Sequence, residues 1–222
     1  MMNRSSILRL SGILAAVAFA FSFLMGAFNS LGGLVVLSRL GLDDRVMSRI
    51  SAGENLLISV LLVAAFVVLS MDKENLAAGL IGAIRSGIYC IFAFGWLIGV
   101  PLISGRGIYF QSLVYIALAV MLFLSVVFIK NNVPRTLRFL AIAAVAYMVV
   151  SQLIWQGVNV YCMCSGVSAY EMSTIYRAVS FFTTLPSLMC IAVLTVYFIA
   201  QARTSDRCQA SCDDGAYLPP QQ

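Results

Sequence analysis

Six apolar stretches of 17 to 26 residues, none containing a charged residue, constrain the fold of this sequence more than any other feature. A helix of about 20 residues crosses the ~30 Å hydrocarbon core of a bilayer. Because lipid offers no partner to an open backbone group, each stretch is expected to be a helix, and the alternating pattern of a membrane barrel strand is absent. The predicted spans are residues 12–37, 55–71, 87–104, 108–129, 139–155 and 178–200.

The composition indicates the same class of protein. Hydrophobic residues make up 61% and charged residues 10% of the 222 positions, and the mean hydropathy is +0.96. A soluble domain carries roughly 45–50% apolar and about 25% charged residues, and a disordered chain needs low hydrophobicity and high charge. Both classes are excluded. We expect an all-α, polytopic bundle of six transmembrane helices over residues 1–200 and a flexible polar cytoplasmic tail over residues 201–222.

The ends of three spans need interpretation. The first span is longer than the roughly 7–15-residue apolar region of a signal peptide, so we expect an uncleaved helix. The second helix is expected to begin near Asp43 and Asp44, which suit a first turn. The nine residues 76–84 cannot cross a bilayer. They are interpreted as an interfacial turn or an early start of the third helix, with Arg85 reaching the membrane surface.

The distribution of Lys and Arg predicts the orientation. With the N-terminus inside, nine cations lie in cytoplasmic segments and five in outer segments. The short loop 130–138, KNNVPRTLR, carries three cations and is the clearest single signal. We therefore predict that both termini are cytoplasmic, in the inner (plasma) membrane of a bacterium.

The sequence contains no histidine. His-ligated haem, HExxH zinc chemistry and a Ser-His-Asp triad are therefore excluded. The net charge of +5 has no basic cluster behind it, so nucleic acid is not an expected partner. We expect no metal, no cofactor and no catalytic residue.

Two pairs of cysteines lie outside the predicted spans. Cys162 and Cys164 form a C-x-C in the longest outer loop, and Cys208 and Cys212 form a C-x3-C in the tail. The first pair suggests a redox pair or a soft-metal site, but membrane thiol oxidoreductases generally need a second cysteine pair. Two ordinary thiols, or one structural disulfide, are the favoured alternative. The tail pair cannot complete a tetrahedral zinc site alone.

Charged residues near span edges form one set of candidate ligand-binding residues. Glu54, Glu171 and Arg177 fall on the predicted outer side, where a charged mouth could receive a polar ligand. Ion pairs that anchor helix ends are the favoured alternative. No ionisable residue is expected at the centre of a span, and this argues against a conventional proton-coupled transporter.

Neutral polar residues inside the spans form a second set. Asn29, Gln152, Thr183 and Thr184 are candidates for lining a small cavity, and Pro186 should kink the sixth span. The alternative is that hydroxyls near the proline satisfy backbone groups that it leaves open.

Small residues at four-residue spacing indicate where helices pack closely. Gly95 and Gly99 form a GxxxG in the third span, and Ser22, Gly26 and Ser30 form a small-xxx-small face in the first. Such faces build a bundle or bind a second copy or another membrane protein. The expected partners are therefore the lipid bilayer and a homo-oligomer or membrane partner.

Three functions remain open. The first is a non-catalytic multi-pass protein that binds or helps to transport a small solute. The second is a sensor or assembly factor that acts through helix packing and the tail. The third is a thiol oxidoreductase that uses Cys162 and Cys164. The sequence favours them in that order.

Overall fold

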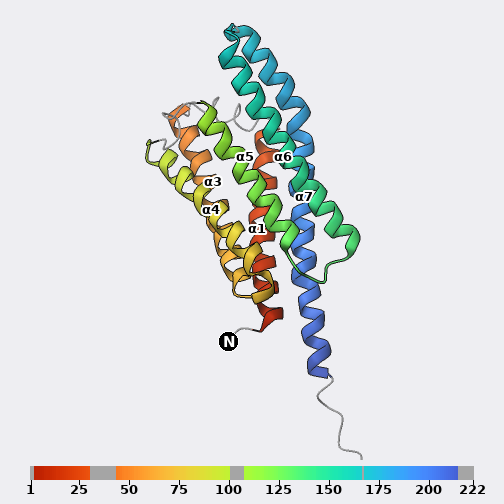
Figure 1. Cartoon of the computed structure of the whole chain (residues 1–222). Coiled ribbons are helices and arrows are strands. Elements are labelled where there is room, and N and C mark those ends of the chain that lie inside the picture. Colours follow the sequence, from red (N-terminus) through yellow and green to blue (C-terminus); the bar gives the residue numbers. More distant parts are fainter. Residues whose placement is uncertain (1–2, 31–43, 101–107, 167, 215–222) are drawn as a thin grey trace, which may run out of the picture.

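The protein is all-helical where the computed structural model describes it, namely residues 3–30, 44–100, 108–166 and 168–214. Figure 1 shows the helices running up and down alternately, with the N-terminus and the end of the last helix at the same end of the molecule. The elements are α1 (Arg4–Ser30), α3 (Asp44–Ser70), a 3-10 turn (Lys73–Asn75), α4 (Leu76–Leu97), α5 (Ile108–Phe128), α6 (Arg135–Cys164) and α7 (Ala169–Asp214).

The predicted class is confirmed, because six of these helices are long and apolar enough to cross a membrane. The protein is an integral, multi-pass membrane protein. The expected early start of the third span is also found, since α4 begins at Leu76 and Asp72 caps the turn before it by accepting a hydrogen bond from the Glu74 amide. The last residues of the predicted first span, 31–37, lie outside the described residues.

The last helix does not end where the sequence analysis places the tail. Instead of stopping at Ala200, α7 continues to Asp214. Gln201 is completely buried, and Ala202 and Ser205 are also buried. The burial of these three residues shows that α7 still packs against the bundle past the predicted boundary. Residues 215–222 lie outside the described part of the chain.

The six helices form a closed ring. Each packs on its neighbours in sequence, and α7 closes the ring by packing along α1, which is the main partner of α7. The closest approaches use glycine. A side chain at Gly82 would collide with the Phe66 ring, and one at Gly79 would collide with the backbone of Ser70. Between α1 and α7, a Cβ on Gly12 of α1 would lie 2.9 Å from the Phe198 carbonyl oxygen of α7.

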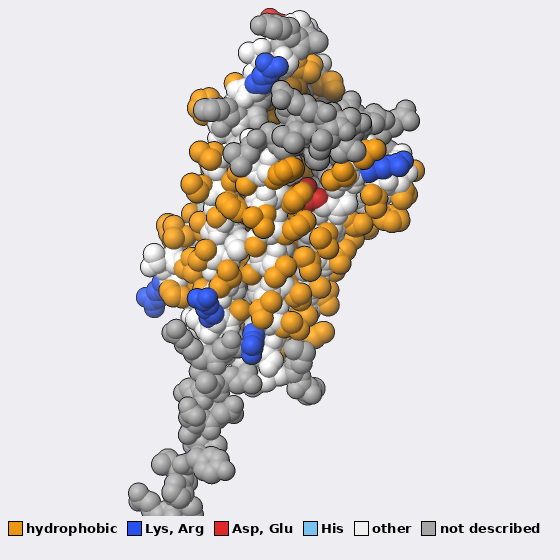
Figure 2. All heavy atoms as spheres, turned by 180° about the vertical axis from the view of Figure 1, so that it is seen from behind, with side chains coloured by type: hydrophobic (Ala, Val, Ile, Leu, Met, Phe, Trp, Pro, Cys, Tyr) orange, Lys and Arg blue, Asp and Glu red, His pale blue; other side chains and the backbone are white. Residues whose placement is uncertain are grey.

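The outside of the bundle is apolar. Figure 2 shows one face covered by a band of hydrophobic side chains, with basic side chains toward both its lower and its upper ends. Large side chains such as Leu113, Phe139 and Phe182 are each at least 70% exposed. Lipid would cover such side chains in a membrane, where they replace the polar surface of a soluble protein.

Only one of the two predicted packing faces lies along a helix. Gly99 lies beyond the end of α4 with a φ of +78°, and the Val100 and Gly99 amides donate to the carbonyls of Gly95 and Trp96. This is a Schellman cap, which needs the left-handed residue that glycine provides. Gly95 and Gly99 therefore do not form a helical GxxxG face.

The second face, Ser22, Gly26 and Ser30, is used in part within the chain. A Cβ on Gly26 would lie 2.7 Å from Leu188 Cδ2, so this glycine lets α1 approach α7. The Ser30 hydroxyl donates to the Gly26 carbonyl at 2.8 Å. At Gly26, the small residue serves packing between neighbouring helices of the same bundle.

Candidate functional site

Arg85 lies in the middle of α4. It is nine residues after Leu76 and twelve before Leu97, or about 14 Å and 18 Å along the helix axis at ~1.5 Å per residue. Arg85 is therefore central in a helix long and apolar enough to cross a membrane, instead of at the edge where the sequence pattern places it. The difference comes from starting the third span at residue 87.

A cavity of about 190 Å³ lies beside Arg85, inside the ring of helices. Four helices contribute to it: α4, α5, α6 and α7. Its polar lining consists of Arg85, Tyr89, Ser151, Gln152 and Ser187, and its apolar lining of Ala119, Leu122 and Met148. Arg85 and Tyr89 line the cavity together because they are four residues apart and share one face of α4.

The Arg85 side chain has an aromatic partner and no acidic one in this cavity. Its Cζ atom lies 4.6 Å from the centre of the Tyr89 ring, which is a cation–π contact. Its Nε atom is fully buried and has no hydrogen-bond partner among the residues that the structure describes. None of the residues that line the cavity is Asp or Glu. The positive charge therefore lies inside the bundle without a countercharge in the cavity wall.

Gln152 is the only member of the predicted ligand-binding set among the cavity-lining residues. No described residue forms a hydrogen bond with its amide, nor with the hydroxyls of Ser151 and Ser187. The cavity thus combines one cation with several neutral groups that can donate or accept a hydrogen bond.

The other two candidates on the sixth span already have partners within the protein. Thr183 is buried, accepts a hydrogen bond from Trp155 Nε1 at 3.1 Å and donates to the Val179 carbonyl at 2.8 Å. The Thr184 hydroxyl lies 3.3 Å from that of Ser180. These bonds fit the alternative that hydroxyls near Pro186 satisfy local groups.

Pro186 itself lies inside α7. A proline removes the hydrogen bond to the carbonyl four residues earlier, which is here the carbonyl of Phe182. The Tyr147 hydroxyl from α6 donates to this oxygen at 3.5 Å, the outer limit for such a bond.

The remaining predicted residues lie away from the cavity. Glu171 forms a capping box with Ser168: its carboxylate accepts from the Ser168 hydroxyl at 2.7 Å, and its own amide donates back to that hydroxyl at 3.3 Å. Arg177 is exposed on α7. Asn29 lies in the last turn of α1 and Glu54 on α3, and neither lines the Arg85 cavity.

The C-x-C motif does not lie in a loop. Cys162 and Cys164 occupy the last turn of α6, where Cys162 is buried and Cys164 is exposed. Residues two apart on a helix do not face each other, and both thiols are free. The Cys164 sulfur instead lies 3.0 Å from the Tyr109 hydroxyl. Among the described residues, no group of three or more His, Cys, Asp or Glu could hold a metal ion.

A second polar region lies at the end of the bundle that carries the N-terminus. Its first half joins the turn before α4 to the loop after α5. Asn75 is completely buried. Its amide donates to Asp72 at 2.7 Å and to the Lys130 carbonyl at 3.1 Å, and its oxygen accepts from the Lys130 amide at 2.6 Å. Asp72 also pairs with Arg4 of α1 at 3.2 Å.

The other half joins the loop after α5 to α7 and α1. Asn131 Nδ2 donates to the Tyr197 hydroxyl at 2.8 Å and to Gln201 Oε1 at 3.0 Å. Gln201 Nε2 donates to the Leu8 carbonyl and to the Ser11 hydroxyl, both at 3.2 Å. We call the two halves together the basal network. It connects α1, α7 and two loops by hydrogen bonds.

The sequence alone does not place Arg85 and Tyr89 in one cavity with the polar residues of the last two spans, such as Ser187. A signal for Arg85 was present, because Asp72 and Asn75 precede an apolar run from Leu76 that is long enough to span a membrane once one arginine is allowed within it. No sequence pattern relates Ser187 to Arg85, because their proximity depends on how the helices close into a ring. Comparison of the chain with protein-family models, with curated proteins and with solved structures gives no match.

Proposed function

We propose that this membrane protein binds a small anionic solute in the Arg85 cavity, as a non-catalytic protein associated with transport. The observation that carries the proposal is the buried Arg85 Nε atom without a hydrogen-bond partner, in a cavity wall without a carboxylate. An ionisable residue inside a membrane span generally marks a substrate or ion pathway.

The charge explains why the solute should be an anion. Placing an arginine at the centre of a membrane helix costs about 2.5–3.5 kcal/mol on insertion scales. A cation–π contact such as that with Tyr89 returns about 0.5–2 kcal/mol. An anion would supply the missing countercharge, and the planar guanidinium suits a carboxylate or a phosphate.

The cavity limits the size of the solute. At ~30 Å³ for each water, a volume of 190 Å³ corresponds to about six water molecules. Sites for drug-sized ligands hold roughly 300–1,000 Å³. Chloride, inorganic phosphate and a carboxylate of three or four carbons are therefore the appropriate chemical class, with Gln152, Ser151 and Ser187 available as neutral hydrogen-bond donors.

The placement of the cysteines does not support the thiol oxidoreductase alternative. Cys162 and Cys164 lie on different faces of α6, so they are not placed to form a disulfide with each other without unwinding the last turn.

Thermal unfolding of the purified protein in detergent tests the proposal. Sodium chloride, sodium phosphate and sodium lactate each replace a bulky organic sulfonate at constant ionic strength. We expect at least one anion to raise Tm by about 5–10 °C at a hundred times its Kd, from a stabilisation of about 2.7 kcal/mol. The Arg85→Gln variant should show no such rise.

Arg177→Gln is the matched control, because it removes an exposed arginine outside the cavity. This variant should keep the full rise in Tm. The proposal is contradicted if no anion stabilises the natural protein, or if Arg85→Gln responds to the anion as strongly as Arg177→Gln does.

A further inference from the structure

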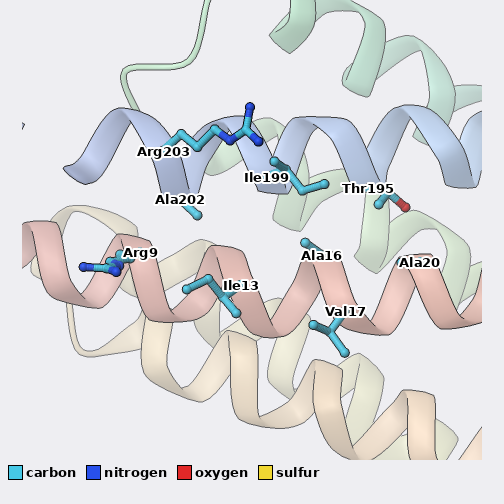
Figure 3. Close-up of a pocket in the computed structure, with 9 residues that line it drawn as sticks. All are labelled: Arg9, Ile13, Ala16, Val17, Ala20, Thr195, Ile199, Ala202 and Arg203. Carbon is cyan, nitrogen blue, oxygen red and sulfur yellow. The ribbon is translucent and has the colours of Figure 1, made fainter. Parts of the chain in front are cut away.

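A groove of about 380 Å³ runs along the outside of the bundle between α1 and α7, separate from the Arg85 cavity. Figure 3 shows Ala16 of α1 and Ile199 of α7 pointing into the space between the two helices, with Ile13 and Val17 on the α1 side and Ala20 and Thr195 at one end. Ile13 and Val17 are 43% and 51% exposed. The middle of the groove is therefore an apolar surface open to the surroundings of the bundle.

Two arginines lie at the opposite end of this groove. Arg9 of α1 and Arg203 of α7 line it beside Ala202, and both are exposed (Figure 3). In Figure 3 the Arg9 and Arg203 side chains extend in opposite directions, and both are exposed, so one anionic group contacts both once the two side chains turn toward it.

Small residues set the depth of the groove. A Cβ on Gly12 would lie 3.1 Å from the Ala202 amide nitrogen, so the two helices are almost in backbone contact there. Ala16 and Ala202 are buried against the neighbouring helix, and their short side chains leave space above them. Ile13, Val17 and Ile199 also line this groove.

The position of the groove matches one leaflet of a bilayer. From Arg9 to Ala20 there are eleven residues, or about 16 Å along the helix at ~1.5 Å per residue. Half of a ~30 Å hydrocarbon core is about 15 Å. The arginines lie at the end of the bundle where the N-terminus and the basal network are found, so the apolar part extends from the surface toward the midplane.

We propose that this groove is a binding site for an anionic phospholipid. One acyl chain lies along Ile13, Val17 and Ile199, and the headgroup phosphate lies between Arg9 and Arg203. Basic pockets between transmembrane helices suit acidic headgroups, and arginine can hold a phosphate by two parallel hydrogen bonds. A zwitterionic lipid could fill the same apolar groove, but it brings no net charge to the two arginines.

Native mass spectrometry of the full-length protein released from detergent tests the proposal. The probes are phosphatidylglycerol and phosphatidylcholine with identical acyl chains. We expect the natural protein to bind phosphatidylglycerol at least about tenfold more tightly. Each of Arg9→Gln and Arg203→Gln should lower that affinity about fivefold, and the double variant about twentyfold, while phosphatidylcholine binding stays unchanged.

The matched control is the double variant Lys73→Gln with Arg135→Gln. It removes two exposed cations at the same end of the bundle but outside the groove, so it should keep the preference for phosphatidylglycerol. Val17→Trp, at an exposed position in the groove, should weaken both lipids because the ring occupies the path of the acyl chain.

Three results would overturn the proposal. The first is equal affinity of the natural protein for the two lipids. The second is a loss of preference in the control double variant as large as that in the Arg9 and Arg203 double variant. The third is displacement of bound phosphatidylglycerol by millimolar glycerol 3-phosphate or inorganic phosphate, which would assign the arginines to a soluble phosphate instead of a lipid.

Discussion

The basal network and the Arg85 region both place polar side chains inside the bundle, but they differ in how those side chains are satisfied. In the basal network, Asn75 and Gln201 are completely buried and both amide groups form hydrogen bonds. In the middle of α4, Arg85 Nε and the hydroxyl of the completely buried Ser86 have no partner. Asn131 Oδ1 is the basal exception among the described residues.

This difference separates two uses of a buried polar group. A group with all its partners in the same chain stabilises the fold, and its removal leaves those partners unsatisfied. A group without partners costs stability, so it persists where something outside the chain can satisfy it. The comparison therefore supports a folding role for the basal network and agrees with the binding role proposed for the Arg85 region.

The largest effect should follow from Asn75→Ala. This change removes three hydrogen bonds, two of them to the amide and the carbonyl of Lys130, and leaves a void where the completely buried Asn75 side chain was. We expect the free energy of unfolding, measured by SDS titration in mixed micelles, to fall by about 3 kcal/mol.

Asn55→Ala is the control for this change. The Asn55 side chain is exposed, and its amide donates to the Ser51 carbonyl of the same helix at 2.9 Å. Its loss should cost less than about 0.5 kcal/mol. Equal losses in the two variants would show that the basal network has no special role in stability.

Two glutamines allow the two regions to be compared directly. Gln201→Ala removes bonds to Asn131, Ser11 and the Leu8 carbonyl, and it should cost about 2 kcal/mol, because hydrogen bonds between membrane helices contribute about 0.6 kcal/mol each and rarely more than about 1.7. Gln152→Ala should change the stability of the solute-free protein by less than about 0.5 kcal/mol. The same titration measures both, and a larger cost at Gln152 would contradict its assignment to binding.

Removal of the Arg85 charge should raise the free energy of unfolding, whereas the substitutions in the basal network lower it. Arg85→Met removes a charge without a countercharge and keeps much of the side-chain volume, so the solute-free protein should become more stable by about 1–2 kcal/mol. Arg138→Met is the control, because Arg138 donates to the Val127 carbonyl at 3.3 Å and its loss should not stabilise the protein. If Arg85→Met destabilises the bundle, the arginine has a structural role.

The sequence predicted the class of fold because hydrophobicity over about 20 residues is a local property. The start of α4 at Leu76 was not predicted as the start of the span, because Arg85 was taken as the boundary. With Arg85 inside the helix, the cytoplasmic side keeps eight of the nine cations assigned to it, and the predicted orientation has a weaker charge bias.

Some short patterns in the sequence indicate one structure and form another, and some contacts leave no pattern at all. Gly95 and Gly99 fit a helix-packing motif by spacing, yet Gly99 ends the helix because the chain adopts a positive φ there. Ser168 and Glu171 have the S-x-x-E spacing of a capping box, which the sequence alone could have identified. The contacts of Asn131 with Gln201, 70 residues apart, depend on ring closure and leave no local pattern.

The smallest effect compares two buried serines. The Ser11 hydroxyl accepts from Gln201 and donates to the Leu8 carbonyl, so Ser11→Ala should cost about 1 kcal/mol. The Ser86 hydroxyl has no partner among the described residues, so Ser86→Ala should stabilise the protein by about 0.5 kcal/mol because an unsatisfied group is removed. SDS titration of both variants checks the signs. A loss of stability in Ser86→Ala as large as that in Ser11→Ala would mean that the middle of α4 is as fully satisfied as the basal network.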